Sequence, residues 1–147
     1  MSGNPLQDLI DQAALRRTAE IYAQGADHLD KDQWRGILAE DCIIEGPGFV
    51  TEGRDACLAS IDQLGAMFRG TCHKIHSQVA QVSQDEASGE TVCTAEHLLR
   101  DEQAILVWTI RYLDRWRREQ GVWRFTRRKL IVEWQEVRPV TNVGAGQ

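Results

Sequence analysis

Three histidines stand out as candidates for proton transfer: His73, His76 and His97. An imidazole titrates near neutral pH, so it can remove a proton from a carbon next to a carbonyl or a leaving group. A buried carboxylate can select the tautomer of such a base and stabilise the imidazolium that forms. A tyrosine such as Tyr22 can donate a hydrogen bond to a developing enolate oxygen. These residue types favour general-base chemistry.

Spacing alone leaves the arrangement of these residues open. Asp27 begins a polar helix end, Asp-His-Leu-Asp-Lys-Asp, where aspartates commonly cap a helix or face water. On an ideal helix Tyr22 and Asp27 lie about 140° apart, so helical periodicity does not pair them. His73 and His76, three residues apart in a predicted strand, should point to opposite faces, so only one of them can face a pocket.

His97 lies on a mainly apolar strand face that suits either a half-buried structural histidine or the lining of a pocket. Its neighbours on that face are Cys93, Ala95 and Leu99. Four tryptophans of the last two predicted strands are interpreted as sheet packing or as a subunit interface. They are Trp108, Trp116, Trp123 and Trp134.

Several other chemistries lack a motif in this sequence. The three histidines are not at helical i, i+4 spacing, and no two cysteines form a C-x-x-C pair, so neither a metal site nor a redox motif is indicated. No glycine-rich phosphate loop, nucleophile elbow or Ser/Cys triad order is present. We therefore expect an activity without metal or other cofactor. Reduced thiols are expected in a cytoplasmic protein. The cysteines are Cys42, Cys57, Cys72 and Cys93.

Length and charge narrow the class of protein further. The 147 residues suit a single domain, with a core over about 5–137 and a flexible tail over 138–147. The net charge of −5 argues against a nucleic-acid partner, and no apolar run is long enough to span a bilayer. Eight basic residues near the C-terminus alternate with apolar ones, which predicts strands with solvated faces. They are Arg111, Arg115, Arg117, Arg118, Arg124, Arg127, Arg128 and Lys129.

Hydrophobic periodicity predicts three helices followed by a meander of long strands. The helices are expected over residues 5–27, 31–40 and 54–68. Short strands are expected over 42–45 and 49–51, and long strands over 73–83, 91–99, 104–117 and 122–135. Segregated helices and strands indicate an α+β domain, with a strongly curved, mainly antiparallel sheet whose concave mouth is the expected ligand site.

This layout resembles the SnoaL-like branch of the nuclear transport factor 2-like superfamily, from about Ala13 to Trp134. The resemblance rests on the order and spacing of several short motifs. They are Ala14-Leu15 through Tyr22 to Asp27, Trp34 with Leu38-Ala39-Glu40-Asp41, Gly53 before the third helix, Thr71-Cys72-His73, and Gly121-Val122-Trp123-Arg124-Phe125 with Arg128. It implies a cone-shaped α+β barrel, in which the sheet wraps around the N-terminal helices.

Within this branch the chain looks most like the group of scytalone dehydratase, hexachlorocyclohexane dehydrochlorinase and bile-acid 7α-dehydratase. Those enzymes use an Asp–His pair inside the cone and no metal. The family aspartate stands fourteen residues before the aspartate that precedes the first strand, as Asp27 stands before Asp41. The family histidine begins the strand after the third helix, which matches His73, with His76 as the rival.

Further matches assign secondary roles in substrate binding or proton relay. The bile-acid enzyme has a functional tyrosine five residues before its aspartate, as Tyr22 precedes Asp27. Scytalone dehydratase has a second pocket histidine on the next strand, at about the place of His97. Here, however, Ala26 replaces a family tyrosine and no tyrosine lies between Cys42 and Thr51, which argues against scytalone itself as substrate. Arg100 and Asp101 likewise replace the acidic strand end of the bile-acid enzyme, which argues against steroid-like substrates.

The resemblance thus predicts a cofactor-independent dehydratase-like lyase or isomerase that acts on a small, largely apolar, oxygenated molecule. It implies self-assembly, as a trimer in preference to a dimer. Two alternatives remain open. One is a non-catalytic small-molecule-binding or assembly domain, because fold alone does not settle function. The other is a different enzyme class on the same fold, such as a polyketide cyclase or the small subunit of a ring-hydroxylating oxygenase.

Overall fold

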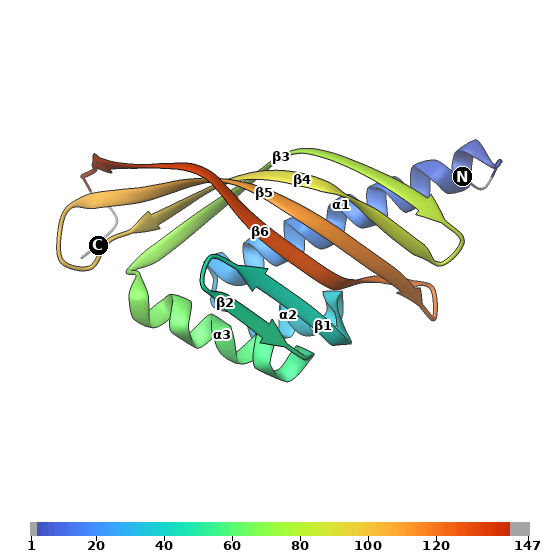
Figure 1. The fold of residues 1–147 in the computed structure, drawn as a ribbon, viewed down its shortest axis with the longest axis horizontal. Coiled ribbons are helices and arrows are strands. Elements are labelled where there is room, and N and C mark those ends of the chain that lie inside the picture. The colour runs from blue at the N-terminus through green and yellow to red at the C-terminus, as the bar shows by residue number, and fades with distance from the viewer. Residues whose placement is uncertain (1–2, 142–147) are drawn as a thin grey trace.

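The computed structural model describes residues 3–141 of the chain, as three helices and six strands (Figure 1). The helices are α1 (Pro5–Asp27), α2 (Lys31–Ile37) and α3 (Arg54–Met67). The strands are β1 (Leu38–Gly46), β2 (Phe49–Glu52), β3 (Gly70–Ser83), β4 (Glu86–Leu98), β5 (Ala104–Glu119) and β6 (Val122–Pro139). No helix among the described residues is long and apolar enough to cross a membrane.

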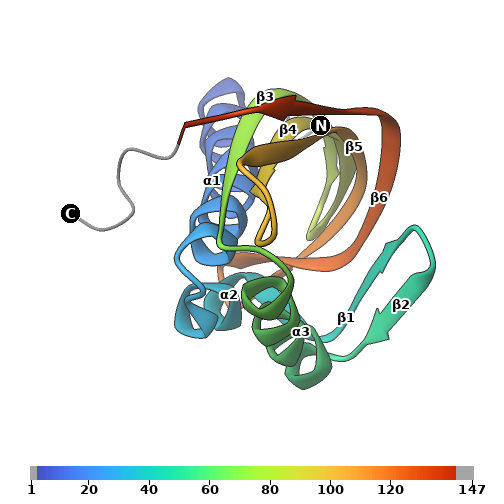
Figure 2. The ribbon, with the colours of Figure 1, turned by 90° about the vertical axis from the view of Figure 1, so that its left-hand side faces the viewer.

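The six strands form one sheet in the order β2-β1-β6-β5-β4-β3. All neighbouring strands are antiparallel except β1 and β6, which pair in parallel. The long strands curl around a concave interior that the helices cover, and the sheet does not close into a barrel (Figure 2). The α+β class and the mainly antiparallel, strongly curved sheet predicted from the sequence are confirmed.

Helix α1 begins and ends where local chemistry sets its limits. The Asn4 side chain accepts hydrogen bonds from the backbone N–H groups of Leu6 and Gln7, and Pro5 occupies the first turn, where its missing N–H costs nothing. At the other end, Asp27 is the last helical residue. Asp30 then caps α2 by accepting from two backbone N–H groups. The chain therefore delivers Asp27 at a defined helix end.

The core lies between α1 and the concave face of the sheet. Alternate residues of β4 and β5 are buried there, and Trp116 and Phe125 stack with their ring centroids 5.3 Å apart. The indole Nε1 of Trp116 donates to Thr18 Oγ1 at 2.9 Å, which ties the middle of α1 to the sheet. Trp123 is also buried, whereas Trp134 is exposed. Trp116 and Trp123 therefore pack the interior, whereas Trp108 is half-buried and Trp134 is exposed.

Several predicted element limits need correction, and three of these differences matter most. The second helix ends at Ile37 because β1 begins at Leu38, four residues earlier than predicted. The residues between the predicted strands 73–83 and 91–99 are mostly strand, because Glu86 already pairs with Arg117 of β5. The strand β6 extends to Pro139, and Val140 N donates to Gln103 O, so the predicted flexible tail over 138–147 is wrong for 138–140. The part of that tail over 142–147 lies outside the described residues.

Candidate active site

Asp27 and His73 contact each other directly, although they come from a helix end and a strand start. His73 Nδ1 lies 2.6 Å from Asp27 Oδ1, and the backbone N–H of His73 donates to Asp27 Oδ2 at 2.9 Å. The Thr71 hydroxyl donates to Asp27 Oδ1 at 2.9 Å. Both side chains are largely buried, with His73 8% and Asp27 19% exposed. The carboxylate thus holds the imidazole in a fixed orientation.

The partners of His73 define which ring nitrogen is free to act. A carboxylate has no proton to give, so His73 Nδ1 carries the proton of this hydrogen bond. The lone pair is then on Nε2, which points away from Asp27. This is the tautomer and orientation that a general base requires.

His97 lies beside His73 on the same face of the sheet. Their ring centroids are 6.0 Å apart, and the register pairs Thr71 with His97 and His73 with Ala95. His97 Nδ1 donates to the carbonyl oxygen of Leu106 at 3.0 Å, which leaves Nε2 as an acceptor. Burial lowers the pKa of His97 below its ordinary value, partly offset by this carbonyl. His97 is therefore a neutral acceptor at pH 7.

Aromatic rings surround His97 on two further sides. Its ring centroid lies 4.6 Å from that of Phe68, just after α3, and 5.1 Å from that of Trp108 on β5. Such rings suit a flat or apolar molecule that approaches the two histidines.

His76 lies on the opposite face of β3 from His73. It is exposed, and its Nε2 lies 2.7 Å from Thr94 Oγ1 on the outer side of the sheet. His76 lies within a register shift between Ile75 and Gln78, where the strand bulges. The structure therefore does not bring His76 to Asp27.

Tyr22 is buried one and a half turns before Asp27 but makes no contact with it. Its ring stacks on Trp34 with centroids 4.3 Å apart and meets the edges of Tyr112 and Phe125. Burial, partly offset by Arg128, raises its pKa above the ordinary value, so the hydroxyl stays protonated and can donate.

Arg128 is the residue that sequence reasoning misplaced, because it is fully buried rather than solvated. Its Nε and Nη2 donate to the two oxygens of Asp114 at 2.7 and 3.1 Å, and Thr91 Oγ1 donates to the same carboxylate at 2.8 Å. The guanidinium lies 3.7 Å from the ring centroid of Tyr112 and 4.4 Å from that of Tyr22. Its Nη1 is buried without a partner among the described residues.

The charge of Arg128 depends on its partner Asp114. Burial opposes the charged guanidinium, but the Asp114 carboxylate outweighs that effect, so the pKa of Arg128 lies above its ordinary value. In the structure Asp114 stands on the neighbouring strand β5, in register with Arg128. The alternation of polar and apolar residues along one strand could not predict that Arg128 is buried, because it does not distinguish an arginine on the inner face from one on the outer face.

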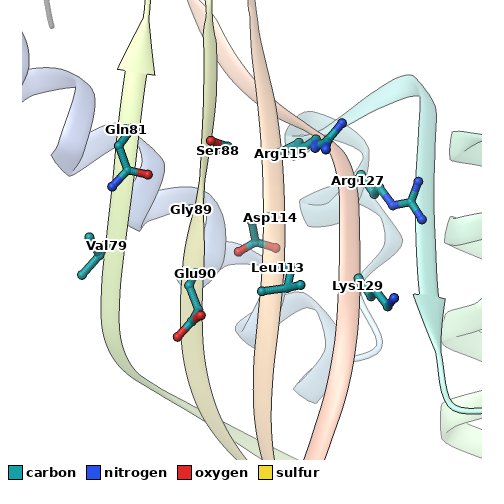
Figure 3. A pocket seen from close by; sticks show the side chains of 10 residues that line it. All are labelled: Val79, Gln81, Ser88, Gly89, Glu90, Leu113, Asp114, Arg115, Arg127 and Lys129. Carbon is teal, nitrogen blue, oxygen red and sulfur yellow. The ribbon is translucent and has the colours of Figure 1, made fainter.

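Two hollows differ in their chemistry. A cleft of about 350 Å³ between α1 and β3 is lined by Arg16, Glu20, Asp27 and His73, among others, so the Asp–His pair reaches the surface there. A larger groove of about 710 Å³ crosses the outer face of β3 to β6 and contains none of the predicted site residues (Figure 3). We assign the candidate active site to the Asp27–His73 pair, because size without reactive groups does not define a site.

No group of three or more His, Cys, Asp or Glu side chains within residues 3–141 is arranged to hold a metal ion. The four cysteines of that range are free thiols, and only Cys72 is exposed.

The curved sheet, the covering helices and the inward Asp–His pair define a SnoaL-like domain with the nuclear transport factor 2-like cone fold. The chain belongs to this family, whose model for the SnoaL-like domain matches residues 7–129. A comparison with curated proteins finds no match.

Solved structures agree with this assignment. A candidate scytalone dehydratase from Novosphingobium aromaticivorans is 27% identical, with a TM-score of 0.80 over 95% of this chain and 97% of its own. A type 2 hexachlorocyclohexane dehydrochlorinase, LinA, is 18% identical, with a TM-score of 0.88 over 96% of this chain and 99% of its own. The type 3 LinA from Novosphingobium barchaimii is 17% identical, with a TM-score of 0.84 over 92% and 94%.

The buried ion pair predicts a large effect of Asp114→Asn on stability. This change leaves the Arg128 guanidinium charged and buried without its counter-ion, which typically costs about 3–5 kcal/mol. Urea unfolding followed by tryptophan fluorescence measures the loss. The matched control is Asp41→Asn, because Asp41 pairs with Arg117 at 2.8 Å on the surface, where such pairs contribute about 0–1 kcal/mol. Equal, small losses of unfolding free energy in both variants would contradict the burial of the Arg128–Asp114 pair away from water.

Proposed function

We propose that the protein is a cofactor-independent lyase of the dehydratase type, or an isomerase, in which His73 is the general base and Asp27 orients it. The observation that carries this proposal is the 2.6 Å contact between His73 Nδ1 and Asp27 Oδ1. It leaves the other ring nitrogen of His73, Nε2, free to act next to the aromatic rings that surround His97.

The proposed elimination needs no oxidant or reductant. His73 Nε2 takes a proton from carbon, and the electron pair of that C–H bond forms the new double bond. The bond from the neighbouring carbon to its hydroxyl breaks, and the imidazolium returns the proton to this leaving group, which departs as water. In an isomerisation the imidazolium returns the proton to another carbon instead. The Asp27 carboxylate stabilises the imidazolium in between.

The substrate proposed is a small, largely apolar molecule with an oxygen substituent. Apolar side chains next to the histidines, Cys93, Ala95 and Ile110, support the apolar part. The acceptor His97 Nε2 suits a hydroxyl group of the substrate. Tyr22 lies about 7.5 Å from Asp27 along α1, a length that such a molecule spans, and its hydroxyl is a donor for a developing enolate oxygen.

The comparisons support elimination chemistry, because a dehydratase and a dehydrochlorinase are among the similar structures and both names denote the loss of a small leaving group. A binding domain without catalysis is the alternative. It predicts that apolar oxygenated ligands bind, while no substrate turns over at a rate that depends on His73.

The Asp–His pair predicts two equal losses of activity. Asp27→Asn favours the wrong imidazole tautomer, and loss of an orienting carboxylate costs about 10⁴-fold in turnover. His73→Ala removes the base itself. The double variant should lose little more than either single variant, because the two residues act as a unit. Steady-state kinetics on an elimination or isomerisation substrate, identified by screening, measures these effects.

The matched control for this test is Asp32→Asn. Asp32 is exposed and pairs with Arg35 on the surface of α2, so its change should leave turnover within a factor of about two. Asp30 is a poorer control because it caps α2, and its loss should cost about 1 kcal/mol of stability. If Asp32→Asn lowered turnover as much as Asp27→Asn, the assignment of Asp27 as the carboxylate that orients His73 would be wrong.

His97 is predicted to be secondary to His73. A neutral acceptor without a carboxylate partner can position a substrate hydroxyl but cannot replace the base, so His97→Ala should retain more activity than His73→Ala. Because the folded pKa of His97 lies below its unfolded value, its contribution to stability is complete above about pH 6.5 and is lost as the pH falls through the folded value. Urea unfolding from pH 7 to 5 should therefore be less pH-dependent in His97→Gln. A larger kinetic loss at His97 than at His73 would reverse the assignment.

We also propose that the chain assembles with itself through the outer face of the sheet, as a trimer in preference to a dimer. The groove on this face carries exposed Val79 and Leu113 together with charges of both signs (Figure 3). The charged side chains that line it are Glu90, Arg115, Arg127 and Lys129. A surface with apolar centres and both signs of charge can be complementary to a second copy.

Leu113→Glu should dissociate this assembly, because it places a charge in the apolar part of the groove. Sedimentation velocity at micromolar concentration should show a trimer for the unaltered chain and a monomer for the variant. Leu9→Glu is the control, since Leu9 is also an exposed leucine but lies on α1, away from the outer face. A monomer in the unaltered chain would refute self-assembly.

A further inference from the structure

The Asp27 carboxylate is held entirely from strand β3. Its Oδ1 receives hydrogen bonds from Thr71 Oγ1 at 2.9 Å and His73 Nδ1 at 2.6 Å, and the His73 backbone N–H spans both oxygens at 3.2 and 2.9 Å. Among the described residues, the Thr71 hydroxyl is the only donor that does not belong to His73. The imidazole is the group to be oriented and the His73 N–H belongs to the backbone of β3, so Thr71 is the one further side chain within residues 3–141 that fixes the carboxylate.

Asp27 needs such a donor because of its place in α1. It is the last residue of a 23-residue helix whose last turn contains no basic residue. The helix dipole is negative at this end and disfavours a carboxylate there. The terminal torsion of an aspartate side chain is also broad, so the two oxygens are not fixed by the side chain itself. A donor fixed to the strand offsets both effects.

Thr71 meets this need through its position on β3. It lies two residues before His73 and therefore on the same face of the strand, where it pairs with His97 of β4. Its hydroxyl must be the donor in the contact with Asp27, because an ionised carboxylate only accepts. A β-branched side chain is stiff at its first torsion, so the hydroxyl direction is well defined.

We propose that Thr71 is a positioning residue for the Asp27–His73 pair. Its hydroxyl anchors Oδ1 so that this oxygen faces His73 Nδ1 and keeps the proton on that nitrogen. The expected effect of Thr71 on turnover rests on the proposed general-base function. The expected effect of Thr71 on the His73 tautomer does not.

The chain offers a matched set of variants. Thr71→Val keeps the shape and removes the donor, whereas Thr71→Ser keeps the donor. Thr94→Val is the control, because the Thr94 hydroxyl also contacts a histidine, His76, but on the outer face of the sheet. All three variants change one hydroxyl or one methyl group on a strand.

The first measurement does not need turnover. In ¹⁵N NMR of the full chain, His73 should show one tautomer with the proton on Nδ1, and Thr94→Val and Thr71→Ser should preserve it. Thr71→Val should give a mixture of the two tautomers and lose the low-field Nδ1–H resonance. If His73 keeps a single Nδ1–H tautomer in Thr71→Val, the proposal is wrong, whatever the kinetics show.

The second measurement is the split between kcat and KM. Partners that orient a functional ligand typically contribute about 10–100-fold, so Thr71→Val should lower kcat by that factor with KM nearly unchanged. Thr71→Ser should recover most of this loss. If Thr71 only held α1 to β3, Thr71→Val would lower thermal stability without this change in kcat. If the unaltered chain converts no substrate, the proposed function fails, while the tautomer measurement still decides the role of Thr71.

Discussion

The contact between α1 and the concave face of the sheet is the interaction on which the site depends. Polar contacts hold this helix near its start, in its middle and at its end. Near its start, the buried Asp11 accepts hydrogen bonds from Arg118 and Trp123 at 2.8 and 3.2 Å. Thr18 is bonded by Trp116 in the middle, and Asp27 is bonded by β3 at the end. Because α1 is fixed at both ends, its last residue meets the strand in one register.

The buried contacts of this helix are unusual in being polar as well as apolar. An apolar face alone tolerates small sliding of a helix, whereas a hydrogen bond between buried groups is lost when its partners move. Asp11 and Asp27 therefore restrict α1 more sharply than packing does. For a base whose reactive nitrogen must be aimed within a fraction of an ångström, this restriction matters more than the stability it contributes.

The ion pair of Arg128 and Asp114 imposes a second constraint, deeper in the cone. A buried charge pair is weak evidence for stability but excludes other packings of the same chain, because any arrangement that separates the two leaves a charge unpaired. The rings of Tyr22, Tyr112 and Phe125 lie around the guanidinium, so this pair also fixes the aromatic wall on the side of α1 that carries Tyr22. The polar interior and the Asp–His pair are thus linked through one helix.

The sequence by itself determined the class of fold, the order of the elements and the limits of α1. Helix α1 could be placed over 5–27 because Asn4 caps it, Pro5 suits its first turn and helix-forming residues continue to Asp27. The opposite faces of His73 and His76 followed from the two-residue period of a strand. These features are local, since each depends on neighbours a few residues away.

Only the tertiary structure decided which polar residues are buried together. Asp27 read locally as a solvated helix end, and Arg128 as a solvated strand residue. Their partners, His73 and Asp114, are 46 and 14 residues away. A side chain is charged and buried only when a distant partner compensates the loss of hydration, and periodicity along one segment contains no information about that partner. The curvature of the sheet and the packing of α1 against it bring these distant partners together.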